Sequence, residues 1–513
     1  MAATKNFDGE AAATRITLTL AMLATVVGVV VATAKWGGIL PMIVGGAAVV
    51  LCTLLMRPDM GTYLFVAFAY SNTIVHLGNT LGNPVAVASG FSILLLVPIL
   101  YYVFVRRETV IIDYPFLLML AFGASVLLST LGSKDVGISM EWMVTYLTEG
   151  VLMYFLLINS IRRLSTLRSV IWVLIFVGVV LSSLSVFQEA TGSYENQFGG
   201  LAQRNTEHGY EDDNSGLLRD REKVRVAHRS GGPTGGPNRY AQILLTILPL
   251  ALFRFWGEPT RSKRVLAGLA GVLVLGAIFL TYSRGGFLSL VGFVGLLTLM
   301  RYIRFRHLIV GTVIIFLLLL VLAPGYIGRV ESITGLDRFT SDVKMEKKQG
   351  DGAIAGRLTE MLAAANVFLD YPILGVGPGQ FSPFYSIDYM SNPEIAFRNI
   401  DSTRRAHILY FELGAETGIL GLGLFLAIAL YVMRRLLLLR ARWRHRNVDL
   451  SHLAAGLMFG VLLYLASATF LHLAYMRFYW LILAVAGSAV RLLTDELARE
   501  QHRLRDAFLE TSE

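Results

Sequence analysis

Apolar residues in this chain occur in long, nearly uncharged runs rather than in the short stripes of a soluble amphipathic helix. A helix needs about 20 apolar residues to cross a hydrocarbon layer about 30 Å thick. The third run, GTYLFVAFAYSNTIVHL, is the least regular because polar residues interrupt it. The pattern predicts an all-α polytopic membrane protein with about 14 transmembrane helices, near residues 16–34, 38–55, 61–77, 87–105, 114–131, 142–160, 169–187, 238–256, 265–282, 285–300, 308–323, 406–433, 452–470 and 477–494.

Two long hydrophilic segments interrupt these runs and divide the chain. Within the second segment, apolar residues recur at helical spacing after Arg357, which predicts a helix with one face on the membrane surface or on the bundle. The predicted parts are N-terminal transmembrane helices (1–187), a first long extracytoplasmic loop (188–236), central transmembrane helices (237–323), a large partly helical extracytoplasmic active-site loop (324–405), C-terminal transmembrane helices (406–494) and a cytoplasmic tail (495–513).

Lys and Arg are concentrated in five short windows that these runs place on one side of the membrane. The windows 106–112, 161–168, 254–264, 301–307 and 434–446 hold 18 Lys and Arg and only two acidic residues. Short loops rich in Lys and Arg stay in the cytoplasm. We therefore expect both termini to be cytoplasmic and both long loops to lie outside the cytoplasmic membrane.

Composition excludes several other classes of protein. The chain is 55% hydrophobic, which is high for a soluble domain. Its net charge of +9 is explained by the membrane-orienting loops, so we expect no nucleic-acid partner. The single cysteine, Cys52, lies in an apolar run, which excludes an intramolecular disulfide framework.

Several arginines lie on the outer side, where arginine is disfavoured next to a membrane span. Arg229 and Arg239 flank the entry to the eighth run, and Arg284 occupies the minimal break between the ninth and tenth. Arg357 opens the predicted loop helix, and Arg405 precedes the twelfth run. Such arginines either reach for lipid phosphates or bind a ligand, and a guanidinium grips phosphate in bidentate fashion. The cluster favours an anionic, lipid-linked ligand such as a diphosphate.

Two further stretches are explained without a phosphate-binding or metal site. The turn GVGPG at 375–379 follows a helix and lacks the Lys and Ser or Thr of a phosphate-binding loop. The acidic run EDD at 211–213 lies in a highly charged loop, which favours a solvated segment over a metal site. We therefore predict no metal and no cofactor.

The stretch AHILYFELGAETGILGLGLFL carries ionisable residues at the outer end of the twelfth run. His407 is either an interfacial histidine bonded to a backbone carbonyl or a general base, since neutral imidazole accepts a proton near neutral pH. Glu412 and Glu416 share one helix face, where they line a polar cavity or tie helices together. Glu149, in the sixth run, is a candidate partner for an arginine.

Four blocks in the last two-thirds of the chain resemble the O-antigen ligase/O-antigen polymerase (WaaL/Wzy) superfamily. They are RSGGPTGGPNRYAQ, TYSRGGFLSL, GRLTEMLAAANVFLDYPILGVGPGQF and AHILYFELGAETGILGLGLFL, in the family's order. Arg284 corresponds to the Ser-Arg-Gly arginine, Arg357 to the arginine that opens the loop helix, and His407 to the catalytic histidine. Arg229 corresponds to the arginine before the Pro-Asn pair. The family has His-Asn where this chain has His407-Ile408.

The resemblance implies a fold related to the GT-C glycosyltransferases and a membrane glycosyltransferase of bacterial surface polysaccharide synthesis, making O-antigen, lipopolysaccharide or exopolysaccharide. It implies metal-independent, inverting transfer of glycan from an undecaprenyl-diphosphate carrier. His407, Arg284 and Arg357 would be catalytic; Arg229, Arg239, Arg405 and Glu416 would bind substrate.

The implied setting is the bacterial inner membrane, with the active site outside the cytoplasm. The partners would be the lipid-linked donor, a glycan or lipid-A-core acceptor and the lipid bilayer, with a chain-length regulator as a further candidate. Two alternatives remain, an O-linked protein oligosaccharyltransferase and a flippase or other transporter of lipid-linked glycan. A transporter more naturally carries its charges near the membrane midplane.

Overall fold

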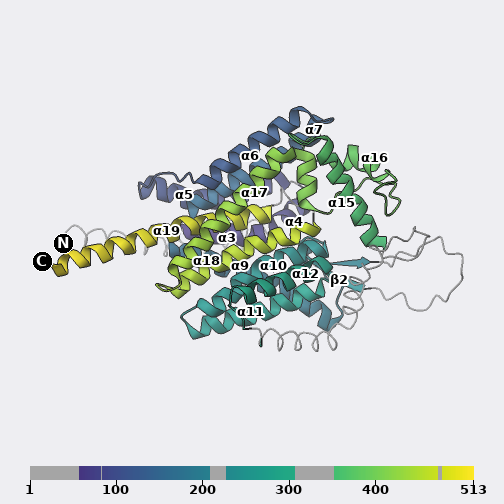
Figure 1. Ribbon diagram of the computed structural model, residues 1–513. Helices are drawn as coiled ribbons and strands as arrows, with labels where there is room; N and C mark the ends of the chain where they lie inside the picture. The colour runs from purple at the N-terminus through teal and green to yellow at the C-terminus, as the bar shows by residue number, and fades with distance from the viewer. Residues whose placement is uncertain are drawn as a thin grey trace, which may run out of the picture.

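The computed structural model describes residues 57–82, 84–207, 227–304, 306, 352–471 and 477–512. They form a bundle of long helices, with short helices and a β-hairpin gathered at one end (Figure 1). The predicted runs 16–34, 38–55 and 308–323 lie outside the described residues, as does the acidic run at 211–213.

The N-terminal half of the bundle is built from short and long helices in alternation. In chain order these are α3 (Asp59–Tyr70), α4 (Thr73–Thr80), α5 (Pro84–Leu100) with the π-helical turn η1 (Tyr101–Val105), α6 (Tyr114–Leu131), α7 (Val136–Thr145) with the π-helical turn η2 (Tyr146–Leu152), α8 (Met153–Ser160) and α9 (Leu164–Thr191). The 3-10 turn η3 (Phe198–Gly200) follows, and then the strands β1 (Gln203–Glu207) and β2 (Ala227–Gly232).

The second half supplies the remaining helices. These are α10 (Pro237–Gly257), α11 (Arg261–Leu280), α12 (Arg284–Leu299), α15 (Gly352–Asp370), the π-helical turn η5 (Phe381–Tyr385), α16 (Ser386–Met390), α17 (Leu409–Trp443), α18 (Val448–Ser467), the 3-10 turn η6 (Ala468–Phe470) and α19 (Arg477–Ser512). Within the described residues, seven helices are long and apolar enough to cross a membrane. A mainly helical, multi-pass membrane protein is thus confirmed, whereas the number of about 14 spans stays a prediction.

The third predicted run, 61–77, is not one continuous span. It is split into α3 and α4 at Asn72, which adopts a left-handed backbone conformation with φ 60°. Asparagine tolerates this conformation better than most residues. The Asn72 Nδ2 donates to the Pro233 carbonyl at 2.8 Å, and the His76 Nε2 lies 2.8 Å from the same oxygen. The break therefore arises from contact with the loop after β2.

The fold is mainly helical, as predicted, and it also includes one short pair of strands. The first long loop contains an antiparallel pair of strands, β1 and β2, with a register irregularity between Gln203 and Arg204. The polar residues of these strands lack the alternation of a half-buried sheet, so the sequence carried no strand signal.

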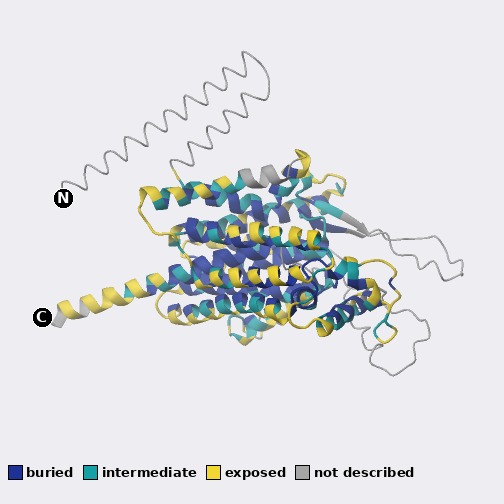
Figure 2. Cartoon of the chain, turned by 90° about the horizontal axis from the view of Figure 1, so that it is seen from above, coloured by how far each residue is buried: buried dark blue, intermediate teal, exposed yellow. Residues whose placement is uncertain are grey.

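The packed centre of the bundle is a group of aromatic rings. Phe122, Tyr146 and Trp480 are fully buried, with ring centroids 5.0–6.3 Å apart. Phe425 of α17 stacks on Tyr479 of α19 at 4.9 Å. Figure 2 shows buried residues concentrated in the interior of the bundle and exposed ones on its outward faces and on the end of α19.

Contacts at one end of the bundle join the first three basic windows. Arg162 pairs with Glu108 at 3.0 Å, which links windows 161–168 and 106–112. Arg168 and Arg254 share the carboxylate of Asp449, at 2.8 and 2.7 Å, which links 161–168 to 254–264. These windows therefore lie side by side, as predicted.

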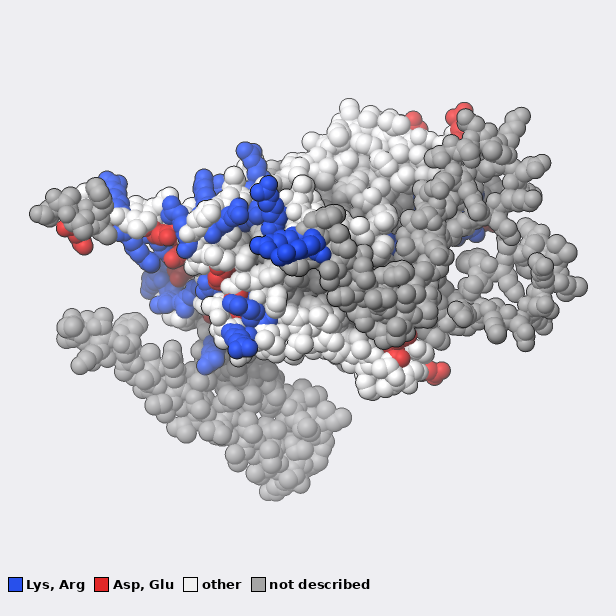
Figure 3. Space-filling view, turned by 60° about the horizontal axis from the view of Figure 1, so that its bottom comes forward, with Lys and Arg blue, Asp and Glu red and all other residues white. Residues whose placement is uncertain are grey.

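The last two windows join the same group through Tyr302. Its ring stacks on Trp256 with centroids 5.7 Å apart, and the Arg440 guanidinium lies 4.8 Å from the ring centroid. Figure 3 shows Lys and Arg gathered towards the end from which α19 projects. In Figure 1 the helices α15 and α16 and the strand β2 lie at the opposite end.

The helix α17 is broken near its N-terminal end, and the loop after α15 fills the break. Gly418 has φ 64° and ψ −170°, which releases backbone groups from the helical ladder. Segment 372–377 takes them up: Ile419 N donates to Pro372 O at 2.8 Å, and Gly377 N donates to Glu416 O at 2.9 Å. In a membrane protein a helix break persists only where such partners exist. This docking holds the loop after α15 on α17.

Candidate active site

The residues just before α17 form a short, tightly held segment that carries His407. Glu412, one turn into the helix, reaches back to it: Oε2 accepts from Ala406 N at 3.0 Å, and Oε1 lies 3.4 Å from Arg405 Nη1. His407 itself has φ 51°, an uncommon conformation for a residue with a side chain. Glu412 therefore stabilises the segment that carries His407.

His407 faces a buried carboxylate from the helix α15. Its Nε2 lies 3.6 Å from Oε2 of Glu360, and Arg404 Nη1 lies 3.6 Å from the other oxygen, Oε1. The Glu360 side chain is 2% exposed, whereas that of His407 is 35% exposed. One edge of the imidazole therefore meets a buried acid, while part of the ring remains accessible.

The charges around this pair set both protonation states. Burial lowers the pKa of His407 to about 4, and the positive charges of nearby arginines act in the same direction; they are Arg357, Arg404 and Arg405. Burial raises the pKa of Glu360 to about 7, against the opposing effect of Arg404, Arg357 and Arg398. At neutral pH the imidazole is uncharged and can accept a proton.

The helix α15 is held in place by its own polar and apolar faces. Thr359 Oγ1 accepts from Phe397 N at 3.0 Å and from Arg398 N at 3.3 Å, which ties the helix to the segment after α16. On the α17 side, Gly414 is the close neighbour of the Phe368 ring, so that the two helices can approach. Arg357 and Glu360, three residues apart, share the face that meets His407.

Glu416, predicted to bind substrate, makes hydrogen bonds within the protein. It is 4% exposed, and its carboxylate accepts backbone hydrogen bonds from Gly379 and Phe381. Gly379 has φ 73°, and a Cβ there would stand 2.2 Å from the Trp142 ring. The GVGPG turn is accordingly a structural joint between α17 and α7, as the absence of a phosphate-loop pattern indicated.

Three arginines come together beside the segment before α17; they are Arg405, Arg239 and Arg477. The Arg405 guanidinium lies 4.5 Å from the centroid of the Trp142 ring. Arg239, in the first turn of α10, lies within electrostatic reach of Arg405 and of Arg477 at the start of α19. Arg477 Nη1 lies 3.5 Å from Glu149 Oε1, so the predicted pairing of Glu149 with an arginine is confirmed. The excess positive charge suits an anionic ligand.

Arg284 lies on the turn between α11 and α12, and Arg229 of β2 lies against that turn. Arg284 is the first residue of α12, after the cap Ser283, whose Oγ accepts from Gly286 N at 3.1 Å. Arg229 is 7% exposed, and its Nε donates to Thr281 O at 3.0 Å. Arg229 therefore braces the turn that carries Arg284, while its Nη2 donates to Asn238 Oδ1 at 3.2 Å.

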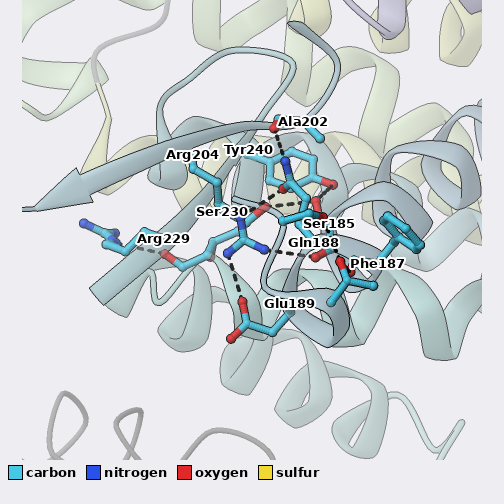
Figure 4. A network of polar contacts seen from close by, with 12 residues as sticks. Ser185, Phe187, Gln188, Glu189, Ala202, Arg204, Arg229, Ser230 and Tyr240 are labelled. Carbon is cyan, nitrogen blue, oxygen red and sulfur yellow. Dashed lines mark hydrogen bonds and ion pairs between the residues drawn. The ribbon is translucent and has the colours of Figure 1, made fainter. Parts of the chain in front are cut away.

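The hairpin that supplies Arg229 is fastened to the C-terminal end of α9 (Figure 4). Arg204 of β1 donates three hydrogen bonds there: Nε to Gln188 Oε1 at 2.9 Å, Nη1 to Glu189 Oε2 at 3.0 Å and Nη2 to Ser185 O at 3.0 Å. Ser230 of β2 donates to Ser185 Oγ at 2.9 Å. This network fixes the position of β2 and, through it, the brace on the α11–α12 turn.

Sequence reasoning named most of these groups and missed one that matters. The structure brings Arg357 and Arg405 near His407, and it sets His407 against Glu360, which the sequence analysis did not single out. The available signal was its spacing of three residues from Arg357 on the predicted loop helix. Arg404 and Arg398 were missed as well, because nothing in an irregular segment predicts which way its side chains point.

The fold and this site define a multi-pass membrane protein with a histidine, a buried acid and several arginines held over one end of its helices. A family model described as O-antigen ligase matches residues 241–426, from α10 to the membrane part of α17. Over these residues the match confirms the predicted resemblance to the O-antigen ligase/O-antigen polymerase superfamily. The matched region includes Arg284, Arg357 and His407. No curated protein matches the chain.

Proposed function

We propose that the protein is a membrane glycosyltransferase of bacterial surface polysaccharide synthesis, of the O-antigen polymerase or ligase type. It moves glycan from an undecaprenyl-diphosphate carrier to a hydroxyl of an acceptor sugar. The observation that carries this proposal is a partly exposed histidine, uncharged at neutral pH, among arginines on the outer-loop helix and the head of α17.

The proposed step needs a base at the acceptor and positive charge at the leaving group. His407 takes the proton of the acceptor hydroxyl while that oxygen forms a bond to the anomeric carbon. The bond from the anomeric carbon to the diphosphate breaks, and the diphosphate keeps the electron pair. Attack from the face opposite the leaving group inverts the anomeric centre. Positive charge placed where negative charge develops stabilises the transition state.

Arginines on both sides of the site suit the diphosphate. Arg357 lies close enough to His407 for its charge to lower the pKa of the ring. Arg239 and Arg405 hold further positive charge near the bundle end, and Arg284 heads α12 on the turn that Arg229 braces. We assign Arg284, Arg357, Arg239 and Arg405 to the diphosphate, and Arg229 and Glu416 to holding the surrounding backbone. Metal independence is part of the proposal, so a chelator should leave transfer unchanged.

The proposed location is the bacterial inner membrane, with both termini in the cytoplasm. The five basic windows lie together at the end from which α19 projects, and α15 and α16 lie at the other end. Because basic loops stay in the cytoplasm, this arrangement supports an active site that opens outside it. Clustering of the arginines at one end favours an enzyme over a flippase, whose charges lie nearer the midplane.

The test is His407→Ala in purified protein with a defined lipid-linked donor. If His407 is the general base, single-turnover transfer should fall by about 10²–10⁴-fold, the usual contribution of such a group. Donor binding should stay within about twofold of wild type, because the arginines remain. His445→Ala, an exposed histidine at the basic end, is the matched control and should transfer normally. Retained turnover in His407→Ala, or donor binding lost in step with activity, would show that His407 is a binding residue only.

A further inference from the structure

The carboxylate of Glu360 is buried but incompletely hydrogen-bonded, which points to a functional role. Its side chain is 2% exposed, and among the described residues its Oε2 has no hydrogen-bond partner. Burying a carboxyl group without full hydrogen bonding is unfavourable, so such groups usually serve a purpose. The group that Oε2 faces is His407 Nε2, at 3.6 Å.

We propose that Glu360 is a positioning residue for His407: it holds the proton of the imidazole on Nε2, orients the ring, and stabilises the imidazolium that forms during transfer. This inference rests on the proposed function of His407 as the base. It also stands on geometry, because two separate elements, α15 and the segment before α17, bring the two side chains together.

The arrangement determines which ring nitrogen is basic. An ionised carboxylate facing Nε2 favours the tautomer with the proton on Nε2, and the lone pair of the neutral ring then lies on Nδ1. An acid that orients a histidine in this manner is the recurring third member of catalytic triads. The residue next to His407, Ile408, is 7% exposed and apolar, so no polar neighbour in sequence can do this.

The protons balance in this scheme. The acceptor hydroxyl gives its proton to His407 Nδ1 as its oxygen bonds to the anomeric carbon, and the diphosphate departs with the electron pair. His407 becomes a cation with protons on both nitrogens. Because Glu360 is ionised at that moment, the cation forms opposite a negative charge. The second proton later leaves to water.

The remaining charged groups near the pair are mostly positive. Arg404 lies 3.6 Å from Glu360 Oε1, and the charges of Arg357 and Arg398 also act on Glu360. Arg405 acts on His407 but is itself paired with Glu412 of α17, at 3.4 Å. These arginines disfavour a cationic His407, which is why the opposing carboxylate of Glu360 matters.

The pH dependence of the rate follows from these charges. Glu360, with its pKa near 7, is ionised above that value, whereas His407 with a pKa near 4 stays neutral down to much lower pH. The wild-type transfer rate should therefore rise as pH increases through about 7 and then level off. In Glu360→Gln this rise should be absent, since the amide does not ionise.

The experiment compares Glu360→Gln, Glu360→Ala and the exposed control Glu394→Gln in the full-length purified protein. Turnover of Glu360→Gln at pH 8 should fall by about 10- to 100-fold, less than the loss of the base itself. Donor binding should be unchanged, and Glu394→Gln should match wild type. The melting temperature of Glu360→Gln should not fall. Because the folded state raises the pKa of this carboxyl, the acid disfavours folding increasingly as pH rises from about 4.5 to 7.

A second readout is independent of activity. Nitrogen-15 spectra of ring-labelled histidine in the membrane-embedded protein, minus those of His407→Ala, report which nitrogen carries the proton. We expect Nε2–H in wild type at pH 8, and a loss of that preference in Glu360→Ala. Nδ1–H in wild type, or a Glu360→Gln variant with normal turnover and the same rise near pH 7, would overturn the inference. Normal transfer in His407→Ala together with an Nε2–H ring would instead refute the proposed function and leave the pairing intact.

Discussion

Replacing Gly418 by alanine tests whether the break in α17 keeps segment 372–377 docked on that helix. The backbone at φ 64° and ψ −170° lies in a region that only glycine occupies readily, so a side chain there costs of order 1–3 kcal/mol. A Cβ would also stand 2.1 Å from Ile373 O, a backbone atom that cannot turn aside.

The loop must then move away and lose backbone hydrogen bonds. Ile419 N donates to Pro372 O at 2.8 Å and Leu420 N to Ile373 O at 3.4 Å, and each such bond contributes about 0.5–1.5 kcal/mol. Together the penalties reach about 2–6 kcal/mol, which weakens loop docking by a factor of about 30 to 10⁴.

The assay is the rate of limited tryptic cleavage at Arg398 and Arg404, which lie in the loop, measured beside glycan transfer. When the loop opens and recloses quickly, cleavage tracks the open population. Gly418→Ala should be cleaved faster and should transfer poorly, because α15 carries Arg357 and Glu360 to the site. Gly423→Ala on the same helix is the control: a Cβ there meets nothing within 4 Å.

Gly375→Ala tests the same joint from the loop side. Gly375 has φ 70°, and a Cβ added there would stand 2.4 Å from the carbonyl carbon of Glu416. Gly375→Ala should therefore also be cleaved faster and transfer poorly. If both Gly418→Ala and Gly375→Ala match Gly423→Ala in cleavage and turnover, the docked loop does not depend on this break.

Two further predictions concern the arginine at the head of α12 and the orientation of the chain. Arg284→Lys should be nearly as damaging to transfer as Arg284→Ala, because the planar guanidinium can hold phosphate in a way that an ammonium cannot. Arg261→Lys at the basic end is the control. Near-normal donor affinity in Arg284→Lys would show that charge alone suffices. In a Cys52→Ser background, Ser391→Cys on the loop should react with an impermeant thiol reagent in cells whose outer membrane is permeabilised, and Ser262→Cys only after inner-membrane lysis. The reverse pattern would contradict the proposed topology.

The hydrophobic pattern was sufficient for the membrane class because bilayer thickness acts on each helix separately. The predicted runs 114–131, 238–256 and 452–470 correspond closely to α6, α10 and α18 with η6. The outer-loop helix after Arg357 was predicted for a similar reason, since its periodic apolar face depends only on local spacing. The split at Asn72 was not predictable, because the contact that causes it comes from the loop after β2.

Residue chemistry in the sequence was enough to name His407, Arg284 and Arg357, and the family match covers all three. Only the tertiary structure decided what neighbouring groups do. Glu416 is used by the backbone of the GVGPG turn, and Arg229 by the turn before α12. Glu360 lies 47 residues before His407 in the chain and 3.6 Å from it in space. Local propensity and residue type are properties of short stretches, whereas a carboxylate gains its role from the charges that folding brings around it.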